Sequence, residues 1–212
     1  TALVRRLPRE KFRHALPNSG HRVLAALLAE GVVGSVLTIN YDLAVENALT
    51  TSGTTGVATV KTPAEYPDLG NVSIVYLHGN VNSPDDEWIL TTEEVDGSWE
   101  VGWRGVVSAR VLAAPAGVFA GMGTLVGVLL STVRGISAAI PDGQRVFQVD
   151  PIDSEESAVY AELGIPEQNY IQAGWCDFAT DFGGRVNQEH VRALQQECIA
   201  LARRDQSDQA EV

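Results

Sequence analysis

The sequence predicts an α/β domain built on a Rossmann-like, doubly wound and mostly parallel sheet of about five strands. Two observations support this prediction. Short apolar runs that suit buried strands alternate with longer stretches of helical periodicity along most of the 212 residues. A polar or glycine-containing turn follows the main strands at the same relative point. This alternation is typical of parallel sheets with helices on both faces, and the length suits one such domain with a full core.

Three regions are expected along the chain: a basic arm or helix at residues 1–17, the α/β domain at 18–204 and a fraying tail at 205–212. The first helix of the domain is expected at residues 21–29, where the apolar side chains share one helical face, and Gly31 can end it.

Five strands are expected, each made of apolar or β-branched residues between turn signals. They cover residues 36–39, 73–77, 117–120, 145–149 and 169–173, and residues 57–60 are long enough for a further short strand. The stretch 111–133 carries no charge, but Pro115 and four glycines interrupt it. We therefore expect a strand, a glycine turn and a buried helix there rather than a membrane span.

Helices are expected between and after these strands. One follows Asp42, one begins at Thr91 or Thr92, and one follows the turn at residues 121–124 and runs to about residue 139. A last helix, capped by Asn187, carries an apolar stripe that we expect to lie in the core rather than in an interface. The stripe consists of Val191, Leu194, Cys198 and Leu201.

The composition limits the partners and cofactors. A formal net charge of −12 argues against nucleic acid, because binding phosphates needs clustered Lys and Arg. Six basic residues lie within the first 22, which favours a solvated helix face, with an acidic partner or membrane surface as the alternative. Cys176 and Cys198 form no CxxC pair and the four His are scattered, so we expect a reduced, metal-free, cytoplasmic protein.

Polar or glycine residues follow four of the expected strands. They are Asn40 and Asp42, His78, Gly121 and Gly123, and Asp150. Because the carboxyl ends of parallel strands meet at one edge of the sheet, these residues are expected to converge on a nucleotide site. Four of them also have a simpler interpretation: Asp42 as a helix cap, His78 as a structural histidine, and Gly121 and Gly123 as an ordinary turn.

Two of these turns carry motifs of a known family. Residues 38–42, Thr-Ile-Asn-Tyr-Asp, with Glu46 in the next helix, resemble the Thr-x-Asn-x-Asp motif of sirtuin-like (DHS-like NAD-binding) domains of the bacterial NAD-hydrolysing branch. Residues 77–79, Leu-His-Gly, are similar to the family's catalytic His-Gly, and Leu90-Thr91 follows after an acidic turn. Residues 121–125 and 146–150 resemble the family's later glycine turn and the strand beside the adenosine.

The resemblance implies that the protein cleaves the bond between nicotinamide and ribose in NAD. NAD would then be the substrate, and the reaction would need no metal ion. The resemblance also implies that His78 is the general base, that Asn40 orients the attacking water or ribose, and that Asp42 holds this geometry by hydrogen bonding. Three further residues, Gly121, Gly123 and Thr124, would receive ribose or phosphate, and Asp150 would meet the adenosine ribose.

The chain also departs from the family. The family's four-cysteine zinc module is missing, which argues against histone-type deacetylation. Its first strand and Gly-rich phosphate loop have no counterpart here. In that fold the first strand lies between the strands at 36–39 and 117–120. We therefore expect these two strands to pair directly, or residues 1–7 or another chain to fill the slot.

Several alternatives remain for the function. The chain could be a fragment of a larger enzyme, or an enzyme completed by a partner subunit or a second copy. It could also be a degenerate, inactive module that binds a nucleotide or another protein.

Overall fold

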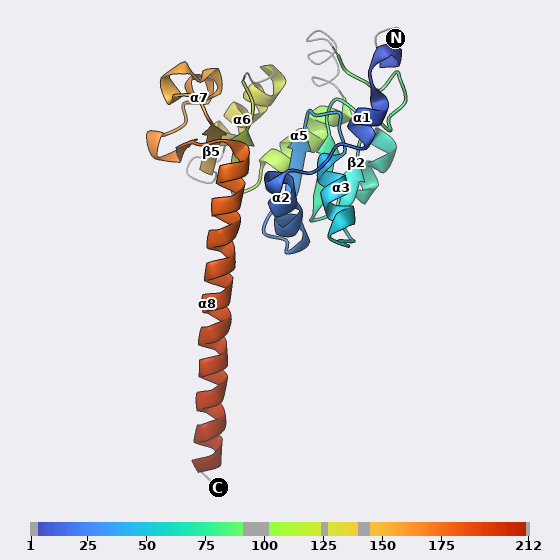
Figure 1. Ribbon diagram of the computed structural model, residues 1–212. Coiled ribbons are helices and arrows are strands. Elements are labelled where there is room, and N and C mark those ends of the chain that lie inside the picture. The colour runs from blue at the N-terminus through green and yellow to red at the C-terminus, as the bar shows by residue number, and fades with distance from the viewer. Residues whose placement is uncertain (1–3, 91–101, 124–126, 140–144, 211–212) are drawn as a thin grey trace.

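The computed structural model describes residues 4–90, 102–123, 127–139 and 145–210, and it has the expected α/β class. Its six strands form two separate three-stranded parallel sheets instead of one sheet of about five strands. Figure 1 shows the two parts side by side, with the long helix α8 leading away from them. The helix expected at Thr91 or Thr92 and the site candidate Thr124 lie outside the described residues.

The first sheet has the order β1-β3-β2 and contains β1 (Ser35–Thr38), β3 (Ser73–Tyr76) and β2 (Ala58–Val60). All four residues of β3 are buried, as an apolar strand in the centre of a parallel sheet requires. Ile74 and Tyr76 pack in one core cluster with α2 (Ser19–Ala29) and α3 (Ala44–Thr51), whereas Val75 packs in another with α5 (Trp103–Leu112). The alternation confirms that helices cover both faces.

The second sheet has the order β4-β5-β6 and contains β4 (Ala116–Ala120), β5 (Arg145–Asp150) and β6 (Tyr170–Gln172). Helix α6 (Gly127–Ala139) packs against α5 and α7 (Ala158–Leu163). The remaining short elements are η1 (Val4–Arg6), α1 (Arg9–Arg13), η2 (Pro63–Asp68), η3 (Ser154–Glu156) and η4 (Glu167–Asn169).

The expectation that β1 and β4 pair directly is wrong, and so is the expectation that residues 1–7 fill the slot as a strand, since Val4–Arg6 is a 3-10 helix. The backbone groups of successive residues in a strand point alternately to its two sides. Thr38 O accepts a hydrogen bond from Leu77 N, so the N–H and C=O of the preceding Leu37 point away from β3. Pro115 O and Gly121 N bond to β5, so the backbone of Val118 points away from β5. No strand in the described ranges pairs with either edge.

The free edges are tolerable because they are not deeply buried. The β1 residues are half-buried and the Val118 side chain is 51% exposed, so water can reach this part of the sheet. The full cost of an unpaired backbone group applies only where water is excluded. The expectation treated these strands as fully buried, as central strands of one continuous sheet would be.

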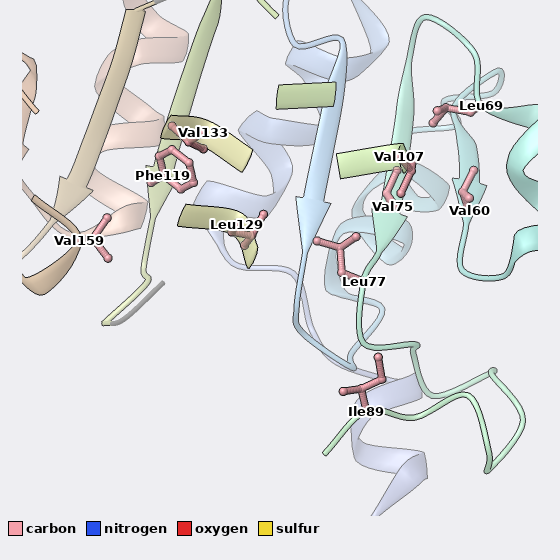
Figure 2. Packing of buried hydrophobic residues seen from close by; sticks show 10 residues of the cluster. All are labelled: Val60, Leu69, Val75, Leu77, Ile89, Val107, Phe119, Leu129, Val133 and Val159. Atoms are coloured by element: carbon pink, nitrogen blue, oxygen red, sulfur yellow. The ribbon is translucent and has the colours of Figure 1, made fainter. Parts of the chain in front are cut away.

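Packed side chains join the two sheets instead of backbone hydrogen bonds. Figure 2 shows one buried cluster that includes Val75 of β3, Leu77 directly after it, and Phe119 of the second sheet, together with Leu129 and Val133 of α6. On another side of the molecule, α2 packs against α8 (Trp175–Ala210). Burial of apolar surface therefore holds the halves together.

Two expectations about α8 are corrected. The helix begins at Trp175 rather than after Asn187, and it continues to Ala210, through the first residues of the expected tail. Its apolar stripe is not core: Val191, Leu194 and Leu201 are each about half exposed and Cys198 is exposed. Contact with α2 stabilises the start of α8, while the rest projects from the molecule (Figure 1). Within the described residues, no helix is long and apolar enough to cross a membrane.

Candidate functional site

The turn after β1 presents Asn40 and Asp42. Asn40 is exposed, and its backbone N–H donates to Thr38 Oγ1 at 3.1 Å. Asp42 is half-buried, and its Oδ1 accepts from the backbone N–H of Ala44, the first residue of α3, at 2.9 Å. Asp42 thus accepts a backbone N–H at the start of α3, as its simpler interpretation held, although Leu43 occupies the N-cap position itself. This bond uses only part of a carboxylate's hydrogen-bonding capacity.

His78 follows the end of β3, after the buried Leu77. Its side chain is half-buried. Burial and, second, the positive charge of Arg104 lower the pKa of His78 below its usual value, so the imidazole is neutral at pH 7. Gly79 is required here for two reasons: its φ is +76°, and a Cβ would lie 2.9 Å from the Glu87 carbonyl oxygen.

The structure brings these two turns together. Leu77 N donates to Thr38 O and Val81 N donates to Tyr41 O, both at 2.9 Å. The rings of Tyr41 and His78 lie 6.3 Å apart between centroids. Asn40, Asp42 and His78 therefore share the carboxyl-terminal edge of the first sheet, which is where parallel sheets bind ligands.

An aromatic group beside this edge was not predicted. Tyr41 stacks on Trp88 with ring centroids 4.7 Å apart and an interplanar angle of 3°, and its hydroxyl donates to the carbonyl of Ile89. The guanidinium carbon of Arg9 lies 5.2 Å from the Trp88 ring centroid. Tyr41 stands between the two polar residues of its motif, but the sequence has no signal that pairs it with Trp88.

A buried polar group underlies the same edge. Tyr76 Oη donates to the carbonyl oxygen of Asp42 at 3.2 Å, and Asn80 Nδ2 donates to Glu46 Oε1 at 3.4 Å. Asn80 is fully buried. Burial raises the pKa of Glu46, and burial followed by the charge of Glu46 raises the pKa of Tyr76. Tyr76 therefore remains protonated and serves as a donor that ties β3 to the turn at Asp42.

The other predicted residues belong to the second sheet. Gly121, with φ +66°, ends β4 and donates to Val149 O at 3.4 Å, which brings it near the end of β5. A Cβ at Gly121 or Gly123 would meet no atom within 4 Å. Asp150 is 6% exposed, and its carboxylate accepts from Ile152 N at 3.2 Å and from Gln148 Nε2 at 3.3 Å.

The predicted residues therefore form two groups, one on each sheet. Asp150 bonds to Gln148 and Ile152, and Gly121 to Val149, all within the second half of the described chain. The described ranges also contain no group of three or more His, Cys, Asp and Glu side chains that could hold a metal ion.

Comparison with known proteins places most of this chain within a described family. A family model for the SIR2-like domain matches residues 34–165, which is more than half of the chain. The match includes both turns of the first sheet and the glycine turn and Asp150 of the second. No curated protein matches the chain.

Proposed function

Because the chain belongs to the SIR2-like domain family, we propose that it takes NAD as a substrate and cleaves the bond between nicotinamide and ribose. Membership of the family implies a function related to NAD, and hydrolysis is the step that we add. The observation that carries this step is the position of His78, half-buried beside the turn that presents Asn40 and Asp42, and burial lowers its pKa. A neutral imidazole can accept a proton at physiological pH.

In the proposed reaction, the carbon–nitrogen bond to nicotinamide breaks and a water oxygen bonds to the ribose carbon. Nicotinamide leaves with the bonding electron pair, and the transition state resembles an oxocarbenium ion. His78 takes the proton that the water loses. Asn40, whose side chain is exposed at the sheet edge, orients the water or the ribose, and Asp42 holds the turn in this geometry.

We further propose that the second sheet binds the rest of the nucleotide. Gly121 and Gly123 leave open space beside their backbone, which a ribose or phosphate could approach closely. Thr124 and Asp150 are proposed for the same part of the ligand. Because the Asp150 carboxylate already accepts two hydrogen bonds, a ribose hydroxyl would be an additional donor to it.

The free edges of β1 and β4 support completion of the site by another segment of polypeptide, as part of a larger protein or a complex. The same observation favours the second candidate function, an inactive module that binds a nucleotide or a protein. The two halves of the site lie on separate sheets, so an isolated chain could bind NAD without aligning it for cleavage.

The test is release of free nicotinamide from NAD by the purified chain. We expect His78→Ala to lower the rate by on the order of a hundredfold or more, the usual size of a general-base effect. His190→Ala, on α8, is the matched control and should change nothing. An unchanged rate in a folded His78→Ala protein would refute the role of His78. Binding of NAD without release would identify the module.

A further inference from the structure

Arg104 lies near the start of α5 and is only 8% exposed, which is unusual for an arginine. Its Nε donates to the carbonyl oxygen of Leu77, the residue before His78, at 2.8 Å. Its Nη2 lies 3.2 Å from Glu87 Oε2 and 3.4 Å from the Glu87 carbonyl oxygen. One side chain therefore joins the end of β3 to the segment around Glu87.

The same segment contacts the His-Gly pair in two other ways. Ile89 N donates to the carbonyl oxygen of His78 at 3.2 Å. The Glu87 carbonyl approaches Gly79 so closely that a Cβ there would lie 2.9 Å from it. The backbone on both sides of the imidazole is thus packed against this segment, and Arg104 is the side chain that bonds to both parts.

We propose that Arg104 is a positioning residue for His78: its buried guanidinium fixes the backbone that carries the imidazole and directs a positive charge toward it. The Arg104–Glu87 pair is partly buried, with side chains that are 10% and 31% exposed. Ion pairs taken out of water often add little stability compared with apolar side chains, so stability alone is a weak reason for this pair. The proposal depends on the proposed function only for the reaction that His78 serves.

The charges around His78 agree with this role. The guanidinium of Arg104 is bonded to the residue before His78 and acts on the imidazole by its charge, and the carboxylate of Glu87 pairs with the guanidinium. From the turn after β1, the neighbour is the uncharged ring of Tyr41. Within the described residues, Arg104 is the charged group that lowers the pKa of His78, in addition to burial, because two adjacent cations repel.

The sign of the charge effect gives a test that mere loosening of the structure cannot imitate. Arg104→Met keeps most of the volume and removes the cation, so the titration midpoint of the His78 imidazole, followed by NMR, should move to higher pH. Glu87→Gln removes the anion that offsets Arg104, so the midpoint should move to lower pH. Loosening would expose His78 and move both midpoints upward.

Arg110→Met is the matched control, because Arg110 lies on the same helix and also donates to a distant backbone carbonyl, that of Leu69, at 3.2 Å. It should leave the His78 midpoint unchanged. Upward shifts in both Arg104→Met and Glu87→Gln, or no shift in either folded variant, would overturn the proposal. The titration needs no activity, so it stands even if the chain fails to release nicotinamide.

Where nicotinamide is released, the rate gives a second readout. Misplacement of His78 in Arg104→Met should lower kcat/KM by on the order of tenfold to a hundredfold. The acidic limb of its pH profile should move to higher pH, because a more basic imidazole is already protonated there. A lowered rate with an unmoved acidic limb would contradict the charge effect.

Discussion

Asp42 has a structural task and a proposed functional one, and the two can be separated by changing only its charge. Its Oδ1 accepts the N–H of Ala44, while its backbone carbonyl accepts from Tyr76. An asparagine keeps an oxygen for the first bond and leaves the second untouched. Asp42→Asn is therefore close to neutral for the helix cap.

We expect Asp42→Asn to lower nicotinamide release or NAD affinity by about tenfold or more, the size of one lost hydrogen bond to a charged group. Its melting temperature should match that of the wild type. Asp42→Ala is the control for the cap and should lose about 1 kcal/mol of stability. If Asp42→Asn retains both NAD affinity and release, the carboxylate is only a cap.

β1 and β4, the strands that were expected to pair with each other, each pair on one side only, as the other edge strands β2 and β6 also do. In β1 the N–H of Val36 points toward β3, whereas that of Leu37 points toward the free edge. In β4 the N–H of Phe119 points toward β5, whereas that of Val118 points away. Each strand therefore contains a protected amide next to a free one.

Hydrogen exchange of the isolated chain should reveal this alternation. The amides of Leu37 and Val118 should exchange at least about tenfold faster than those of Val36 and Phe119, because only the second pair must open a ladder hydrogen bond first. Equal protection within each pair would mean that a strand covers these edges in solution, for example from a second copy, and a dilution series would detect such a copy.

The molecule as a whole depends on a close contact between α2 and α8. A Cβ on Gly183 would lie 2.5 Å from Val23 Cγ1, whereas a Cβ on the neighbouring Gly184 would meet nothing within 4 Å. Val23 has little freedom to move aside, since a β-branched side chain in a helix is restricted to one main rotamer. The contact therefore requires glycine at position 183 but not at position 184.

We expect Gly184→Ala to stabilise the protein by up to about 1 kcal/mol, because alanine favours the helix. Gly183→Ala should instead destabilise it by roughly 1–3 kcal/mol, since overpacking outweighs that gain. Denaturant unfolding of both variants measures the difference. If the Gly183→Ala protein were as stable as the Gly184→Ala protein, the close contact of α8 with Val23 on α2 would be contradicted.

The elements of the fold follow from local patterns. β1, β3 and β5 lie where apolar runs between turn signals predict them, and both turns of the first sheet carry their polar residues at the expected places. Strand formation and turn chemistry depend on residues only a few positions apart, so a single sequence contains the information needed.

Other features depend on distant segments and could not be predicted. Arg104 reaches Leu77 across 27 positions, and Tyr41 meets Trp88 only because two loops converge. The stripe on α8 has the pattern of a core face, but periodicity does not specify what covers it, and here nothing in the described residues does. Whether β1 and β4 would pair was likewise decided by the packing of helices around them, because apolar burial joins the two sheets without a shared ladder.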